Sequence, residues 1–261
     1  NRLYIAALAA ALMAGCSDDD GMTVRKNVLP DDGVIRLEAG INDMSSRAVG
    51  YTANGLDELG LFVDNAGSAD YSYANVYMKK DASGKWTSFE SNGTTPWMML
   101  WQSQSATVDV TAYAPYDAAA TADGNVAGTV ETDQTAEENG RKSDVLFAAA
   151  AVTPDAPDTS NDIYYDVNTE KLKVNMGHAL SKLTVNIRYG TEMTQGGAVP
   201  APEAVTLGGT MTGWSLSIAD GTVLASGSVQ DIAMMLSDNA AEGYDKCAEA
   251  ILVPQAAAFT V

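Results

Sequence analysis

Hydrophobic and polar residues alternate over short stretches along most of this chain. Between residues 35 and 41 every odd position is apolar, whereas Arg36 and Glu38 occupy even positions. A period of two residues is typical of a β-strand with one buried face. The same pattern recurs at residues 183–189 and 214–218. Further strands are predicted at residues 59–63, 74–80, 85–90, 107–113, 145–149, 172–176 and 249–253.

The pattern indicates an all-β fold. No stretch carries a long, capped hydrophobic repeat of 3.6 residues, which would be the mark of an amphipathic helix. The predicted strands are expected to pack as sandwiches of antiparallel sheets. Residues 117–142 are rich in Ala, Thr, Asp, Gly and Glu and are predicted to form a long surface loop.

A stretch with two prolines, residues 153–162, is predicted to link two domains. We place the boundary near residue 160, which gives an N-terminal β-sandwich at residues 33–160 and a C-terminal β-sandwich at residues 161–261. After the last strand candidate the sequence shows no closing turn or polar end. The second sandwich is therefore expected to be incomplete here, with a hydrophobic strand edge uncovered.

The apolar run that ends at Cys16 has the parts of a bacterial lipoprotein signal peptide. Arg2 precedes the run, small residues stand directly before the cysteine, and a run of aspartates follows it. The run is too short for a membrane-crossing helix, which needs about 20 apolar residues. We predict a signal peptide at residues 1–15, lipidation of Cys16 as the new N-terminus on a membrane surface, and a tether at residues 16–32.

Charge and cysteine content narrow the possible partners. With 15 basic and 34 acidic residues the net charge is −19, which argues against nucleic acid as a partner because phosphate recognition relies on clustered Lys and Arg. Cys247 is the only other cysteine. With Cys16 acylated it has no partner for an internal disulfide, so we expect it to be a small buried residue or an exposed unpaired one.

Catalytic and metal-binding patterns are scarce. His178 is the only histidine and directly precedes an alternating stretch, and no Gly-x-Ser-x-Gly elbow accompanies it, so a structural role is favoured over catalysis. One histidine and one unlipidated cysteine do not make a zinc site, and the acidic clusters lack the spacing of a calcium loop. No metal, no cofactor and no enzymatic activity are expected. A carboxylate pair for glycoside hydrolysis remains an open alternative, although no Asp or Glu is marked out by its context.

Two further features are open to more than one interpretation. Trp97 and Trp101 flank an apolar stretch that would serve either as an aromatic ligand platform or, as we favour, as a core strand. Arg47 lies in a small polar loop after the first predicted strand, where proteolysis concentrates. Taken alone, it would be an ordinary solvated arginine.

Several segments together resemble the fimbrillin family, the shaft and accessory subunits of type V pili in Bacteroidales. Each segment is short, but their order and their spread over most of the chain make the combination specific. Besides the signal through Cys16 and the Arg47-Ala48 loop, they are GLFV (60–63), YANVY (73–77), GKW (84–86), VTAYAPY (110–116), SDVLFA (143–148), HALSKLTV (178–185) and ILVPQ (251–255).

The resemblance implies two transthyretin-like β-sandwich domains and a pilin or pilus-accessory role. It also implies a lipoprotein precursor that a maturation protease cuts after an Arg or Lys in the loop following the first strand, a position that Arg47 matches. Removal of residues 35–41 would leave a hydrophobic groove, which a strand of another pilin subunit can fill. The implied location is the cell surface, first on the outer membrane through the lipid anchor and then in the pilus.

Three functional hypotheses follow. The first is a structural or accessory fimbrial subunit exported as an outer-membrane lipoprotein. The second is a surface glycan-binding lipoprotein of a polysaccharide-uptake system, with Trp97 and Trp101 as candidate ligand contacts. The third is a hydrolase that uses two carboxylates, which is the least favoured because no residue points to it.

Overall fold

The computed structural model describes residues 27–42, 50–52, 55–190, 202–256 and 259–261. Almost all of its regular structure is β-strand, as the alternating sequence predicts. The elements are β1 (Leu37–Ile41), β2 (Glu58–Asp64), a 3₁₀ turn η1 (Ala69–Tyr71), β3 (Tyr73–Lys80), β4 (Trp86–Phe89), β5 (Val108–Ala114), β6 (Asn125–Thr129), α1 (Glu137–Ser143), β7 (Leu146–Val152), β8 (Ile163–Asp166), β9 (Lys171–His178), β10 (Ser181–Ile187), β11 (Thr206–Ser217), β12 (Val223–Ala233), β13 (Met235–Ser237) and β14 (Lys246–Leu252).

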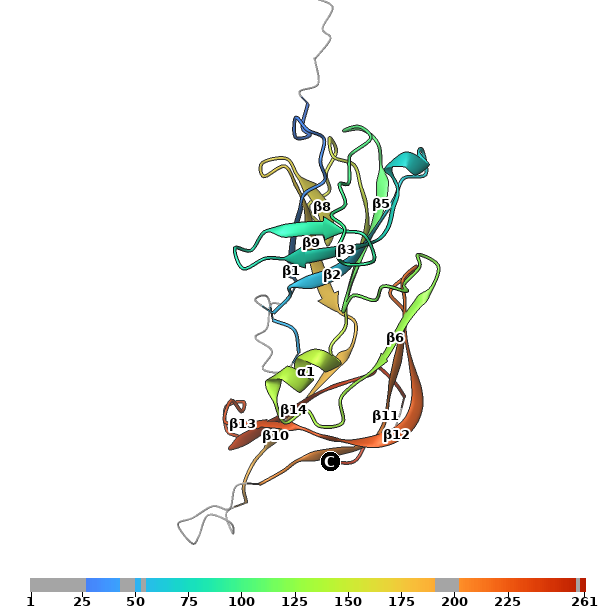
Figure 1. Ribbon diagram of the computed structural model, residues 1–261. Coiled ribbons are helices and arrows are strands. Elements are labelled where there is room, and N and C mark those ends of the chain that lie inside the picture. The colour runs from blue at the N-terminus through green and yellow to red at the C-terminus, as the bar shows by residue number, and fades with distance from the viewer. Residues whose placement is uncertain (1–26, 43–49, 53–54, 191–201, 257–258) are drawn as a thin grey trace, which may run out of the picture.

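Eight strands form a first sandwich, in the upper half of Figure 1. They are hydrogen-bonded in the order β1-β9-β7-β5-β2-β3-β4, with β8 paired to β9. The path turns a corner where β7 meets only the last two residues of β9. Side chains from both sides of this corner share one hydrophobic cluster, with Leu61 and Val110 on one side and Leu172 and Val174 on the other. The alternating apolar residues thus fill the space between two layers.

Two three-stranded sheets form a second sandwich below the first (Figure 1), with orders β12-β11-β6 and β10-β14-β13. Its cluster includes Trp214 and Leu216 from β11 and Ile251 from β14. Phe62 of β2 and Tyr113 of β5 belong to this second cluster although their strands lie in the first sandwich. The two sandwiches are therefore joined by packed side chains.

The prediction of an all-β fold built from sandwiches is confirmed. The predicted long loop at residues 117–142 differs from the structure, because it contains β6 and α1. In β6 only Val126 is buried, and α1 is a seven-residue polar helix whose N-cap position is occupied by Ala136 without a side-chain cap. Neither segment carries a periodic apolar pattern, and tertiary contacts decide its conformation.

The predicted boundary at residue 160 does not coincide with the change between sheets. Strands β8 and β9 follow that residue but belong to the first sandwich, and β6 precedes it but pairs with β11. Val126 and Val130 already belong to the second apolar cluster, the chain then returns to the first up to Met176, and it belongs to the second from Leu180 onward. Prolines mark where a chain leaves regular structure, but they do not show which sheet the next strand joins.

One strand pair departs from the expected antiparallel arrangement. β1 runs parallel to β9, with Leu37 opposite Leu172 and Ile41 opposite Met176. Parallel neighbours need a long connection. Here strands β2 to β8 provide it, so β1 is placed in its sheet by residues more than a hundred positions away.

Candidate subunit interface at strand β1

Strand β1 is an edge strand that pairs with β9 alone among the described strands. At its start the amide of Leu172 donates to the carbonyl of Arg36 over 2.7 Å, and just beyond its end the amide of Asn42 donates to the carbonyl of Met176 over 2.8 Å. Even-numbered residues of this strand therefore bond to β9. The main-chain groups of the odd-numbered residues point to the opposite, open edge.

The side chains of the odd positions hold β1 against the first sandwich. Ile35, just before the strand, and Leu37 are each 5% exposed, and Ala39 and Ile41 pack against the same cluster while partly buried. Full burial of one Leu or Ile side chain is worth about 1.5–3 kcal/mol. Hydrophobic burial is thus the main force that keeps this strand in place.

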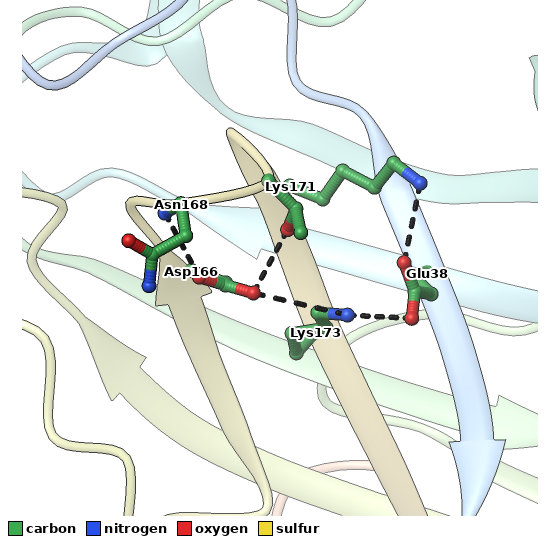
Figure 2. Close-up of polar contacts among 6 residues, drawn as sticks. Glu38, Asp166, Asn168, Lys171 and Lys173 are labelled. Atoms are coloured by element: carbon green, nitrogen blue, oxygen red, sulfur yellow. Dashed lines mark hydrogen bonds and ion pairs between the residues drawn. The ribbon is translucent and has the colours of Figure 1, made fainter.

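A charged network secures the other face of β1 (Figure 2). Glu38 Oε1 accepts from Lys173 Nζ over 2.5 Å, and its Oε2 accepts from Lys171 Nζ over 3.1 Å. The hydrogen bond from Lys173, followed by that from Lys171, lowers the pKa of the Glu38 carboxyl. One carboxylate of β1 therefore binds two ammonium groups of the neighbouring strand.

The network continues to β8. Lys173 Nζ lies 3.9 Å from Asp166 Oδ2. Asp166 also accepts from the Asn168 amide over 2.9 Å and from the Thr169 hydroxyl over 2.9 Å, and these bonds lower its pKa. The turn after β8 therefore holds the Asp166 carboxylate in place through local hydrogen bonds. Glu38, in contrast, lies on β1, more than a hundred residues earlier in the chain.

A second ion pair lies at the entry to β1. The guanidinium of Arg36 donates to both oxygens of Asp32, over 3.0 and 2.5 Å. This bonding, assisted by the Val34 amide, lowers the pKa of Asp32 to about 2. The pair is local and about half exposed, so it orders the entry to the strand more than it anchors the strand to the sheet.

A groove runs between the open edge of β1 and β4. One cavity of about 460 Å³ is bordered by Ile35, Leu37, Trp86 and Trp97, and a second of about 450 Å³ by Glu38, Lys85, Trp86 and Lys171. Residues 95–101 cover one end of this space, because their main chain bonds both to β4 and to the segment before β1. Free volume and positive charge therefore adjoin β1 along its open edge.

The structure separates the two tryptophans singled out in the sequence. Trp101 is 6% exposed and packs edge-on against Tyr165, with ring centroids 5.6 Å apart, so it is a core residue. Trp97 is half-buried, meets Tyr73 edge-on at 5.8 Å and lines the groove beside exposed Met98. Only Trp97 is placed to meet a ligand.

Cys16 and Arg47 lie outside the described residues. The described chain resumes after the Arg47 loop at Gly50, and the amide of Tyr51 donates to Asp144 Oδ2 over 2.9 Å. The same oxygen lies 2.6 Å from Nδ1 of His178, and both side chains of this pair are nearly inaccessible to solvent. His178 thus has the structural environment that the sequence favours, at the end of β9.

Cys247 is a buried, unpaired cysteine, and burial raises the pKa of its thiol. No group of three or more His, Cys, Asp or Glu residues suited to a metal ion occurs within the described residues. In the same part of the chain, no helix has the length and apolar character needed to cross a membrane.

The two lysines that bind Glu38 are not marked out as a site by the sequence. Lys171 and Lys173 alternate with Leu172 and Val174, which is a readable strand signal and predicts that both lysines share one face. Their partner is 133 and 135 positions away, so the sequence gives no sign of the pairing.

Comparison with known proteins agrees with this fold. A family model described as fimbrillin-like matches residues 46–261, so the chain belongs to the fimbrillin-like family. Its membership makes it a fimbrial subunit and implies a cell-surface location, contacts with other fimbrial subunits and no enzymatic role. No curated protein matches the sequence.

Two solved structures share the fold. A candidate cell adhesion protein of Bacteroides uniformis is 18% identical, with a TM-score of 0.52 over 86% of this chain and 76% of its own. A candidate cell adhesion protein of Bacteroides ovatus is 19% identical, with a TM-score of 0.54 over 85% of this chain and 77% of its own. At these identities the likeness concerns the fold alone.

Proposed function

We propose that this fimbrial subunit is exported as an outer-membrane lipoprotein anchored through Cys16 and is then cut after Arg47. Strand β1 leaves, and an extended strand of a second subunit takes its place beside β9. The observation that carries the proposal is the position of β1 as an edge strand, held by side-chain burial and one charged network.

Loss of β1 would create a site suited to strand addition. Leu172, Val174 and Met176 of β9 are fully buried and would lose the side chains of the neighbouring strand. The β9 main chain would lose its hydrogen-bonding partner on that side. An added strand supplies both at once, since main-chain bonds give affinity and alternate side chains fill pockets. The family match begins at residue 46, so β1 lies outside the matched part of the chain.

The chain beyond the cut would remain attached. The Tyr51 side chain is 6% exposed within the first cluster, and its amide bonds to Asp144. Cleavage after Arg47 would therefore free the lipid and β1 without releasing the segment that follows.

Mass spectrometry of fimbriae sheared from the cell surface tests this proposal. The expected N-terminus of the assembled subunit is Ala48, and Arg47→Ala should leave acylated, unassembled precursor in the outer membrane. Arg25→Ala, in the predicted tether, is the matched control and should mature normally. Assembled subunits that always begin at acylated Cys16 and remain intact at Arg47 would contradict processing and strand exchange.

A glycan-binding role is a second candidate, because Trp97 and exposed Met98 border the groove beside β1. Glycan-array binding that is lost in a folded Trp97→Ala variant, and kept in Met211→Ala, would support it. If the unchanged protein binds no glycan on the array, the glycan-binding role is rejected.

A further inference from the structure

We propose that the site left by β1 selects its incoming strand by charge and register: it takes an extended segment of a second subunit that carries a carboxylate where Glu38 now lies, opposite Lys173. The inference rests on the proposed strand exchange and adds the chemistry of the partner segment. It starts from the network in Figure 2.

If Glu38 left together with β1, Lys171 and Lys173 would lose the carboxylate that forms ion pairs with both of them. Lys171 has Glu38 as its ion-pair partner, and among the described residues Lys173 would keep Asp166 alone, at 3.9 Å. Asp166 is also engaged by the Asn168 amide and the Thr169 hydroxyl. With a strand in the β1 position the Lys173 side chain is only 18% exposed, so an incoming strand without a carboxylate would cover this ammonium group without replacing its lost bond. A carboxylate on the incoming strand would restore both ion pairs.

The neighbourhood of the vacated strand is positive in a strongly acidic protein. Lys85 borders the same cavity as Glu38 and Lys171, and Lys80 lies over the Trp86 ring at 5.6 Å. The chain as a whole has a net charge of −19. A segment from a second copy of an acidic subunit is therefore electrostatically complementary to this groove.

Charge would also decide the register of the added strand. Alternating apolar residues prevent a slip of one position, because such a slip would bury the polar face, but they permit a slip of two. In the present register Glu38 is opposite Lys173. A slip of two residues toward the end of β9 would place the carboxylate opposite Asn175, which carries no positive charge. In the present register the carboxylate pairs with both lysines, which disfavours a slip toward the end of β9.

The groove has room for a strand bulkier than β1. Both cavities adjoin Leu37, and the second also adjoins Glu38, so free volume lies beside these two positions of the strand. Larger apolar side chains on an incoming strand would bury more surface beside Trp86. The expected partner segment is therefore extended, alternately apolar, bulky and acidic at the position opposite Lys173.

Peptide exchange into the nicked full chain tests the selection. A recognition site for a sequence-specific protease is inserted within residues 43–49, the protein is cut there, and fluorescent peptides of residues 31–42 compete for the β1 site. We expect Glu38→Gln in the peptide to weaken uptake about tenfold, as the loss of two partly exposed ion pairs would do. Asp31→Asn, which removes the same charge from an exposed position, should change uptake little.

The protein side of the pair gives the matching control. In a Lys171→Gln, Lys173→Gln variant, the Glu38 and Glu38→Gln peptides should enter equally. Equal uptake of both peptides by the unchanged protein would overturn selection by charge while leaving strand exchange intact. Failure of every peptide to enter, with β1 still bound, would instead count against the proposed function and with it this inference.

Hydrogen exchange tests the role of the lysines in the uncut chain, without a protease step. Hydrogen exchange at the β1 amides should quicken about tenfold in Glu38→Lys and return toward the original rate when Lys173→Glu is added, because the reversed pair re-forms. Unchanged exchange in Glu38→Lys would show that the lysines do not recognise the strand.

Discussion

The main-chain amide of Tyr51 donates to the carboxylate of Asp144 over 2.9 Å, which ties the chain just beyond the Arg47 loop to the residue that follows α1. The same carboxylate bonds to His178 at the end of β9 and accepts from the Val145 amide. One buried side chain therefore connects three segments that are distant in sequence.

Replacing Asp144 should destabilise the protein strongly. Asp144→Ala leaves the Tyr51 and Val145 amides without their acceptor and His178 without its carboxylate, in a site where Asp144 is 1% exposed. We expect a loss of about 3 kcal/mol in the free energy of unfolding. Urea denaturation measures it, with exposed Asp123→Ala as the control. A loss no larger than that of the control would show that the carboxylate does not organise this junction.

The two tryptophans should respond differently to truncation. Trp101→Ala removes a core ring packed on Tyr165 and should cost about 3–5 kcal/mol of stability. Trp97→Ala, at the half-buried edge of the groove, should cost about 1 kcal/mol. Denaturant titration of the two variants checks the contrast. Similar losses would mean that Trp97 is as much a core residue as Trp101.

Attachment of β1 should weaken in acid. The pKa of Glu38 is lowered in the fold from its ordinary value of 4.5, chiefly by the Lys173 bond. The stabilisation of β1 by Glu38 is therefore fully present when the pH is above the ordinary pKa. It is lost as the pH falls through the lowered pKa of the folded protein. Asp32, with a pKa of about 2, and Asp166 act in the same direction at lower pH.

Hydrogen exchange at the β1 amides, corrected for intrinsic rates, checks this dependence between about pH 6 and pH 3. Protection should fall across this range, and part of the fall should disappear in Glu38→Gln, which has no carboxyl to titrate. An identical acid response in that variant would assign the effect to other groups.

Gly60 should not accept a side chain. A Cβ atom at this position would lie 2.1 Å from Cε1 of Tyr113, whose ring lies over β2 and whose hydroxyl donates to Asn75 over 2.7 Å. Gly60→Ala must displace this fully buried ring, and we expect it to cost about 2–3 kcal/mol. Gly40→Ala is the control, because a Cβ there meets only Asn175 Oδ1 at 3.8 Å. Equal thermal stability of the two variants would contradict the close packing of Tyr113 on Gly60.

Strands with one buried face were predictable because their pattern is local. Residues 35–41, 172–176 and 183–189 alternate as their burial requires, and they correspond to β1, β9 and β10. Elements whose formation depends on distant partners were not predictable. β6 is held by pairing with β11, and β12 is exposed along most of its length, so neither shows a regular apolar face.

The sequence by itself determined the β-sandwich class, the acidic character of the surface, and the amphipathic first strand, since each depends on residue type and short spacing alone. Tertiary structure decided that β1 runs parallel to β9 and is an edge strand, and that Glu38 meets Lys171 and Lys173. It also placed Trp101 in the core and Trp97 at the groove. These are contacts between residues far apart in the chain, and folding brings them together through burial and hydrogen bonding that no local pattern encodes.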